Sequence, residues 1–227
     1  MSTILITGAN RSLGYEAARR LIEAGHDVWI GARSVERGQE AAEALGARFV
    51  QLDVTDDASV AAAAETVGAL DVLVNNAGIA GEFKPVAETT VDDVRPVFEV
   101  NVFAPLRVFQ AFLPALERSA NPVVVNVSSG MGSLARTTEP GTDENGFTNV
   151  HYSPSKAALN MLTSQLARSY PGIRINAADP GYTATDFNHH SGHQTVEEGT
   201  DVIVELAQIG PDGPTGELRD RHGVVPW

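Results

Sequence analysis

The chain has 227 residues, of which 43% are hydrophobic and 20% are charged. This length allows one sizeable core and is too short for two ordinary domains, so we expect residues 1–227 to form a single domain. The absence of cysteine excludes disulfides, thiolate metal sites and cysteine nucleophiles. A net charge of -13 repels phosphate backbones, so we expect no nucleic-acid partner, whereas a local basic pocket could still bind a small anion.

The N-terminal segment Met1–Gly8 runs straight into an apolar strand with no basic stretch before it, which argues against a signal peptide. No apolar run approaches the roughly 18 residues that a membrane-spanning helix needs. We therefore expect a cytoplasmic protein without a membrane partner.

Short apolar runs rich in β-branched residues alternate with segments of helical pattern from the first residue to about Ala178. This alternation predicts an α/β protein with a parallel sheet and crossover helices. The runs leave little room for polar faces, so both sides of the sheet should be covered, as in a doubly wound fold. The predicted strands are Thr3–Thr7, Asp27–Gly31, Arg48–Leu52, Val72–Asn75, Pro122–Val127 and Ile173–Ala177.

Helical patterns fill most of the chain between these strands. Prolines at 96, 105 and 114 interrupt the longest of them, so we expect breaks or kinks there. Two irregular segments, Gly130–Val150 and Thr183–Gln194, are expected to be loops. The predicted helices are Leu13–Ala24, Ser34–Leu45, Asp57–Val67, Val91–Arg118 and Tyr152–Ser169.

A glycine-rich turn, Thr7–Gly14, follows the first strand and opens the first helix. Small residues in such a turn let backbone N–H groups approach a pyrophosphate, and the positive end of the helix also favours an anion. A tight strand-to-helix connection would need the same residue types. The turn alone therefore leaves both interpretations open.

Tyr152 and Lys156 lie four residues apart at the start of a predicted helix, so their side chains should share one face. A free tyrosine ionises near pH 10, and a nearby ammonium favours the phenolate. We therefore expect Lys156 to bring the pKa of Tyr152 toward the working range of a proton-transfer group. A solvated lysine on the helix surface is the alternative.

Several motifs, taken together and in order, resemble the short-chain dehydrogenases/reductases over nearly the whole chain. The tail, from Thr195–Gly199 through Gly213–Gly216 to Trp227, is similar to the carbonyl-reductase branch of that family. The resemblance implies a Rossmann-type doubly wound parallel β-sheet flanked by helices on both faces, and an oxidoreductase. The motifs are Thr7–Gly14, Asn75-Asn76-Ala77-Gly78, Asn101, Ser128-Ser129, Tyr152-x-x-x-Lys156 and Pro180-Gly181 to Thr185.

The resemblance implies a catalytic role for Asn101, Ser129, Tyr152 and Lys156. Tyr152 would give its proton to a carbonyl oxygen, Ser129 would hydrogen-bond to the same oxygen, and Lys156 would also hold the nicotinamide ribose. Asn101 would complete a proton path through water to Lys156. We choose Ser129 over Ser128 because the second serine aligns with the family pattern and strand alternation puts the two on opposite sides. A turn residue at Ser129 and a helix-kink residue at Asn101 are the structural alternatives.

The resemblance also implies a nicotinamide cofactor. One departure is plain, since Ser12 stands where the family has the middle glycine of the phosphate turn. Its Cβ could crowd the pyrophosphate, or its hydroxyl could hydrogen-bond to it. The candidate cofactor-binding residues are Gly8, Asn10, Arg11, Ser12, Leu13, Gly14, Arg33, Asp53, Val54, Asn75, Ala77, Gly78, Asn101, Tyr152, Lys156, Pro180, Gly181, Thr183 and Thr185.

Charge at the end of the second strand indicates which nicotinamide cofactor binds. Enzymes that prefer NAD place a carboxylate there, whereas this strand ends in Gly31-Ala32-Arg33. Arg33 and Arg11 would suit the 2'-phosphate of NADP(H), each charge-assisted bond contributing roughly 1.5 to 3 kcal/mol. Solvated surface arginines are the alternative. Asp53 would contact the adenine, serve as a helix N-cap or loop carboxylate, or do both.

Three histidines, His189, His190 and His193, fall in the second predicted loop. They lie in a segment with no predicted helix and no paired carboxylate, so we expect a substrate lid or a solvated loop and no metal. The 130–150 connection is longer than is usual in the family. It should shape the pocket or block an oligomer surface. In the carbonyl-reductase branch that the chain resembles, such insertions accompany monomers, so the resemblance slightly favours a monomer over a homo-oligomer.

These features favour NADPH-dependent reduction of a small carbonyl compound, an aldehyde, ketone or quinone. A protein that senses NADP(H) without turnover would not need the whole Asn/Ser/Tyr/Lys set. A sugar-nucleotide epimerase or dehydratase would need a larger carboxyl-terminal substrate region than this chain has. The sequence leaves the substrate and the physiological direction open.

Overall fold

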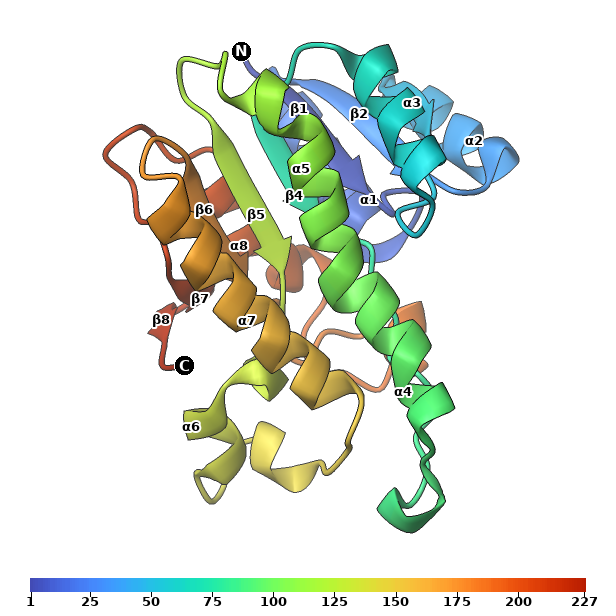
Figure 1. Cartoon of the computed structure of the whole chain (residues 1–227), viewed down its shortest axis with the longest axis vertical. Coiled ribbons are helices and arrows are strands. Elements are labelled where there is room, and N and C mark those ends of the chain that lie inside the picture. Colours follow the sequence, from blue (N-terminus) through green and yellow to red (C-terminus); the bar gives the residue numbers. More distant parts are fainter.

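An eight-stranded sheet runs through the centre of the computed structural model, which describes residues 1–227 (Figure 1). Its strand order is β3-β2-β1-β4-β5-β6-β7-β8, and only β8 runs antiparallel to its neighbour. The strands are β1 (Thr3–Thr7), β2 (Asp27–Ala32), β3 (Arg48–Gln51), β4 (Val72–Asn75), β5 (Val123–Val127), β6 (Arg174–Ala178), β7 (Leu218–Asp220) and β8 (Gly223–Val225). Strand order reverses between β1 and β4, which in doubly wound sheets is where ligands bind.

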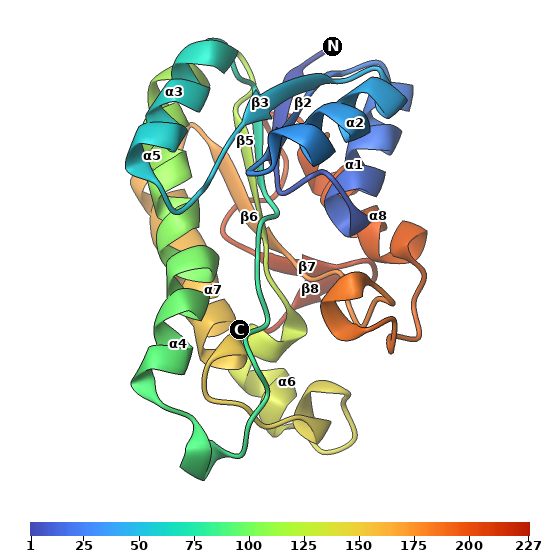
Figure 2. The ribbon, with the colours of Figure 1, turned by 90° about the vertical axis from the view of Figure 1, so that its right-hand side faces the viewer.

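Helices cover both faces of the sheet, as Figure 2 shows in a view along its edge. On one face lie α1 (Ser12–Glu23), α2 (Val35–Leu45) and α8 (Val196–Ala207), and on the other α3 (Asp57–Val67), α5 (Ala104–Leu116) and α7 (Tyr152–Ser169). Side chains of β1 alternate between the two cores, with Ile4 and Ile6 on the α1 side and Leu5 on the α5 side. The predicted doubly wound α/β fold is thereby confirmed.

All six predicted strands and the predicted helices are present, with ends shifted by one or two residues except in the longest helix. The fifth strand begins at Val123 and not at Pro122, since proline has no N–H to donate to the ladder. Apart from the 130–150 segment and short turns, the elements that sequence patterns missed are β7, β8 and α8. β7 and β8 have three residues each, too few to show a period, whereas α8 begins with a capping box between Thr195 and Glu198 that could have been recognised.

The longest helical segment does not break at its prolines. It consists of α4 (Val91–Phe98), a π-helical turn (Glu99–Phe103) and α5, which Figure 1 shows as one continuous rod. Pro105 directly follows the π-turn, and Pro96 and Pro114 lie inside α4 and α5, which continue past them. The expected breaks are therefore wrong, and the irregularity is the π-turn, in which the N–H of Ala104 donates to the carbonyl of Glu99.

The segment 130–150 is only partly a loop, since it contains α6 (Leu134–Thr138) and two short 3-10 turns, Gly130–Gly132 and Glu144–Gly146. Ser133 caps α6 by accepting a hydrogen bond from the N–H of Arg136. The other segment, 183–194, contains one 3-10 turn, Asp186–Asn188. A further 3-10 turn, Val86–Glu88, precedes α4. None of the helices combines the length and apolar character that crossing a bilayer requires.

Candidate active site

The glycine-rich turn lies at the point where strand order reverses, and two of its glycines have no room for a side chain. Gly8 has φ +66°, and a Cβ there would lie 3.1 Å from Cα of Ala77. A Cβ at Gly14 would lie 2.5 Å from Nδ2 of Asn76 and 2.9 Å from Cα of Ala9. These close contacts hold the amino end of α1 against the end of β4 and leave its first N–H groups available to an anion.

Ser12 occupies the position of the missing glycine and adopts the backbone conformation that glycine would supply. Its φ is 50°, in the left-handed region that costs other residues roughly 1 to 2 kcal/mol. The path of the turn is therefore retained despite the substitution, and the cost is backbone strain in the first residue of α1.

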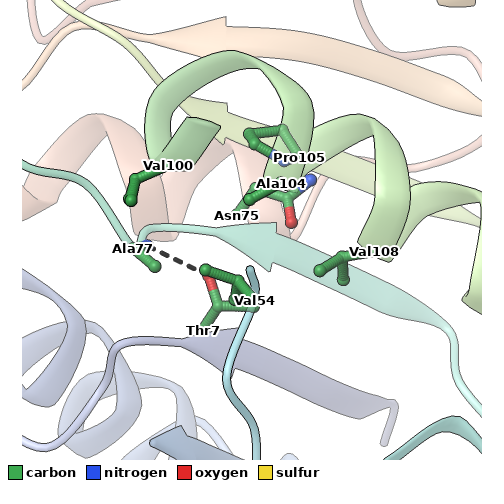
Figure 3. Close-up of a pocket in the computed structure, with 8 residues that line it drawn as sticks. All are labelled: Thr7, Val54, Asn75, Ala77, Val100, Ala104, Pro105 and Val108. Atoms are coloured by element: carbon green, nitrogen blue, oxygen red, sulfur yellow. Dashed lines mark hydrogen bonds between the residues drawn. The ribbon is translucent and has the colours of Figure 1, made fainter. Parts of the chain in front are cut away.

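Hydrogen bonds join this turn to the end of β4 (Figure 3). The hydroxyl of Thr7 accepts from the N–H groups of Asn76 and Ala77, each at 3.0 Å. The amide of Asn76 donates back to the carbonyls of Thr7 at 2.8 Å and Gly8 at 3.3 Å. Asn76 stands in the recognised motif but not among the candidate residues. Its function, visible only in three dimensions, is to hold the turn.

Other candidate residues near the turn use their side chains elsewhere. Asn75 donates to Oδ1 of Asn126 at 2.9 Å, and Asn126 donates to Thr163, all in the protein interior. A cofactor contact from Asn75 would therefore come from its main chain. Val54 lines a small hollow with Thr7 and Ala77, so three segments meet there (Figure 3).

Arg33 and Asp53 line the same surface hollow beside β3. Oδ1 of Asp53 accepts from the N–H and the hydroxyl of Thr55, at 3.0 and 2.7 Å. The N-cap of α3 is Asp56. Asp53 is therefore a loop carboxylate and not a helix cap. Burial opposes its ionisation, but the hydrogen bonds from Thr55, and after them the charge of Arg33, keep the pKa of Asp53 below its ordinary value.

Arg11 is exposed and pairs with Asp186, at 3.4 Å between Nη1 and Oδ2. Asp186 belongs to the 183–194 segment, so this ion pair connects the phosphate turn to that segment. Exposed pairs of this kind contribute little to stability, so Arg11 can exchange its partner at low cost.

Tyr152 and Lys156 lie together on α7, as their spacing predicts. Lys156 is 4% exposed, and its Nζ lies 5.6 Å from the centre of the Tyr152 ring. The ammonium donates a hydrogen bond to the carbonyl of Val127 at 2.8 Å, at the carboxyl end of β5. A buried lysine fixed at the end of a central strand is not a solvated surface charge.

The pKa values of this pair differ from the sequence-based expectation. Burial raises the pKa of Tyr152 above its ordinary value; a hydrogen bond with Ser129 opposes the rise and the charge of Asp179 adds to it. Burial lowers the pKa of Lys156 to about 8, against the opposing effect of Asp179. The expectation that Lys156 brings the pKa of Tyr152 down is therefore wrong for this structure, and Tyr152 is a protonated phenol at neutral pH.

The two serines after β5 have different surroundings. Ser128 is 3% exposed, and its hydroxyl donates to Oδ1 of Asn160 at 2.5 Å. Ser129 is partly exposed, lies beside the phenol of Tyr152, and accepts from the N–H of Met131 at 3.2 Å. Only Ser129 is therefore placed to hydrogen-bond to an atom to which Tyr152 also hydrogen-bonds.

Asn101 lies in the π-turn and is 1% exposed. Its side chain accepts from the N–H of Ile79 and donates to the carbonyl of Ile79, both at 2.9 Å, and also donates to Ser155 at 3.0 Å. A Cβ at Gly78 would lie 3.4 Å from Oδ1 of Asn101 and 3.8 Å from Nζ of Lys156. Because Gly78 follows Ala77, which contacts Gly8, the phosphate turn and the Tyr152/Lys156 pair belong to one site.

The loop after β6 uses its side chains internally. The N–H of Gly181, a residue with φ +69°, donates to Oδ1 of Asp179 at 3.0 Å. Thr183 is 4% exposed and its hydroxyl donates to the carbonyl of Pro180 at 2.9 Å, and Thr185 is also buried. Cofactor contacts predicted for Pro180, Gly181, Thr183 and Thr185 would thus fall mainly to backbone atoms.

The histidines of the 183–194 segment do have carboxylate neighbours, contrary to the sequence-based expectation. His190 lies 3.1 Å from Asp186 at i, i+4 spacing, and His193 lies 3.7 Å from Asp143. These are single pairs. No cluster of three or more His, Cys, Asp or Glu side chains is arranged to hold a metal ion.

Aromatic rings form a cover over Tyr152 that sequence patterns did not reveal. The ring of Phe187 lies 5.5 Å from that of Tyr152, between ring centres. Tyr182 contacts Phe147 at 5.9 Å and His193 at 5.8 Å. The two irregular segments, 130–150 and 183–194, therefore meet beside Tyr182, and Phe187 of the second segment lies against Tyr152.

A doubly wound sheet with a glycine-rich turn at its switch point, next to a Tyr–Lys pair on one helix, defines an oxidoreductase of the Rossmann type. The family model described as short chain dehydrogenase matches residues 2–196, and the chain belongs to this family.

Similar proteins include the (-)-isopiperitenone reductase of Mentha piperita, 33% identical over 93% of this chain and 94% of that one. The (+)-neomenthol dehydrogenase of Arabidopsis thaliana is 34% identical over 97% and 96% of the two chains. Among solved structures, an NADPH-bound carbonyl reductase from chicken fatty liver superimposes with a TM-score of 0.86 and 30% identity, covering 100% of this chain and 99% of that one.

Proposed function

We propose that the chain catalyses the NADPH-dependent reduction of a carbonyl compound, an aldehyde, ketone or quinone, to an alcohol. The observation that carries the proposal is the protonated phenol of Tyr152, with the Lys156 ammonium and the Ser129 hydroxyl beside it, next to a glycine-rich turn. Relatives named as reductases support the reaction type. In this proposal, residues 1–227 act as one NADP(H)-binding domain on a small molecule, as a monomer.

The residues present fit a nicotinamide dinucleotide. Gly8 and Gly14, where a Cβ would collide with Ala77 and Asn76, let the turn pack closely against the end of β4, and the N–H groups at the amino end of α1 would then bind the pyrophosphate. The segment Ala77–Gly78 and the ammonium of Lys156 would hold the other half. When bound, the nicotinamide supplies the hydride for the carbonyl carbon.

The preference for NADP(H) rests on Arg33 and Arg11, since the comparisons include both an NADPH-bound carbonyl reductase and a 3-oxoacyl-[acyl-carrier protein] reductase with bound NAD. No carboxylate ends β2, and Arg33 is exposed in that place. Arg11 would leave Asp186 for the 2'-phosphate, an exchange between two anions that a guanidinium makes readily.

The side chains of this site divide the proton chemistry among them. Tyr152 donates its proton to the carbonyl oxygen, and its raised pKa keeps that proton in place until the oxygen becomes basic. Ser129 donates a hydrogen bond to the same oxygen and orients it. Lys156, held by Val127, would bind the nicotinamide ribose, and Asn101 fixes the Ile79 backbone beside it.

The test follows NADPH absorbance while aldehydes, ketones and quinones are screened. We expect turnover with the wild-type chain and a loss of about 10²- to 10⁴-fold in Tyr152→Phe, which keeps the ring but has no proton to give. A protein that binds NADPH but reduces nothing in the screen would instead fit the sensor alternative. Activity that survives in Tyr152→Phe would refute the mechanism.

A further inference from the structure

Asp179 is a buried carboxylate that the mechanism above does not use. It follows β6 directly, is 3% exposed, and receives a hydrogen bond from the N–H of Gly181 at 3.0 Å. Burial of a carboxylate without a cation on it is costly, and burial accordingly raises the pKa of Asp179. Such a group needs an explanation.

A second carboxylate, that of Glu144, lies next to Asp179 at Gly130. A methyl group at Gly130 would collide with the carboxylates of both Glu144 and Asp179, so the two groups lie on one glycine. The cation nearest to Glu144 is Arg136, at 3.7 Å from Oε1, and its other nitrogen already binds Asp220 at 2.8 Å. Two carboxylates thus share one distant arginine, and the charge of Glu144 raises the pKa of Asp179 further.

The charged and titratable groups around Asp179 come from every element packed against it. They are Tyr152 and Lys156 on α7, Arg136 on α6, Glu144 on the 144–146 turn, and Asp220 on β7. Arg219 offers only its backbone carbonyl to Asp179, because its guanidinium pairs with Glu217. In the register of β5 and β6, Ala178 lies opposite Val127, whose carbonyl binds Lys156, so Asp179 lies at the strand ends that also carry Ser129 and the ammonium of Lys156.

We propose that Asp179 is a positioning residue for the proposed reduction: its carboxylate keeps the buried Lys156 cationic and Tyr152 protonated, and Glu144 acts on them only through Asp179. This inference rests on the proposed function for its catalytic meaning. The charge effect itself is a property of the folded chain and can be measured without turnover.

The proposal fixes the direction in which each substitution changes the pKa of Lys156. An isosteric Asp179→Asn removes a negative charge near both groups, so the pKa values of Lys156 and Tyr152 both fall. Glu144→Gln removes a like charge next to Asp179, which ionises more readily, so the pKa of Lys156 stays or rises. The two carboxylate-to-amide substitutions beside Gly130 should therefore give different results. Loss of a merely structural contact would not produce this difference.

The chain offers a direct readout, because Lys84 and Lys156 are its two lysines. With ¹³C-labelled lysine, NMR titration of the Cε signals resolves them, since ion pairs with Asp93 and Glu82 raise the pKa of Lys84 while that of Lys156 is about 8. We expect Asp179→Asn to lower the pKa of Lys156 by on the order of one unit. We expect Glu144→Gln to leave or raise it, and the double variant to match Asp179→Asn.

In the same variants, the basic limb of kcat/KM against pH for carbonyl reduction should move to lower pH in Asp179→Asn and should not in Glu144→Gln. An unmoved Lys156 signal in Asp179→Asn, or an equal fall in Glu144→Gln, would overturn the inference. The Lys84 signal serves as the internal control for folding. If Asp179→Asn does not fold, the direction in which Glu144→Gln changes the pKa of Lys156 decides whether the inference holds. If the chain reduces no carbonyl, the proposed function is wrong, and the NMR titration still tests the charge effect by itself.

Discussion

The ammonium of Lys156 donates a hydrogen bond to the carbonyl oxygen of Val127, 2.8 Å away. Val127 is the last residue of β5, and Ser128 and Ser129 follow it directly. One bond therefore places the lysine of α7 in fixed relation to the serine of the neighbouring strand end. It also holds the charged end of Lys156 inside the protein, where burial lowers its pKa to about 8.

This depressed pKa predicts a pH-dependent stability. Between pH 8 and 10.5 the unfolded chain binds more protons at Lys156 than the folded chain, so the free energy of unfolding rises with pH in that window. Relative to Lys156→Met, the wild type should gain about 3 kcal/mol across it. Urea unfolding at pH 7, 8.5 and 10 measures the difference, which should be flat below pH 8.

The control is Lys84→Met, since the ion pairs of Lys84 raise its pKa and its difference from wild type should not rise over the same window. A flat difference for Lys156→Met up to pH 10 would show that the buried ammonium has an ordinary pKa.

Substitution of the two serines should separate catalysis from folding. Ser129→Ala should lower kcat by about 10²- to 10³-fold, because the carbonyl oxygen loses a hydrogen-bond donor. Ser128→Ala should keep turnover and lose about 1 to 3 kcal/mol of stability, because Oδ1 of Asn160 is left buried without its donor. Steady-state kinetics and thermal unfolding distinguish the two, and the reverse pattern would mean that the serine assignment is mistaken.

Replacement of Arg33 should change the cofactor preference. Arg33→Asp removes a cation from the place proposed for the 2'-phosphate and adds a carboxylate that suits the ribose hydroxyls of NAD. The ratio of NADPH to NADH affinity should fall at least about tenfold, given roughly 1.5 to 3 kcal/mol for a charge-assisted bond. Arg37→Asp, the same charge change at an exposed position of α2, is the matched control. Equal ratios in wild type and Arg33→Asp would contradict the assignment.

Phe187 should affect substrate binding more than chemistry. Its ring lies 5.5 Å from that of Tyr152 and is 43% exposed, so it forms part of the cover over the proton donor. Phe187→Ala should raise KM for a ring-containing ketone about two- to tenfold, the equivalent of one aromatic contact, and leave kcat nearly unchanged. His189→Ala, at an exposed position two residues further along, should change neither KM nor kcat. A large fall in kcat with unchanged KM would instead place Phe187 in the catalytic step.

Sequence patterns predicted most of the sheet because its central strands are buried on both faces. Ile4, Leu5 and Ile6 form a continuous apolar run that only a doubly covered strand tolerates. The same patterns could not show β7 and β8, which are three residues long and depend on pairing with β6. The proline rule failed because the helical rod continues past Pro96, Pro105 and Pro114, and its irregularity is the π-turn between the first two.

For the site, residue spacing predicted that Tyr152 and Lys156 share a face, but not what surrounds them. The pKa expectation for Tyr152 considered its neighbouring ammonium and left out burial, which is the larger effect. Asp179 and Glu144 lie 35 positions apart in the sequence and meet only because Gly130 has no side chain. Contacts of this kind require the fold and cannot be read from local patterns.

The π-turn at Glu99–Phe103 holds one residue more than an α-helical turn would. Insertion of one residue as a bulge leaves the helix on either side in its original phase, so Val97, before the turn, and Phe109, after it, both face the core. Deletion of Val100 would restore a regular helix and keep that packing, while Asn101 would rotate by about 100° away from Ile79. The packing of the helix therefore does not need the additional residue, whereas the geometry around Asn101 does. The extra length of this helix serves the site alone.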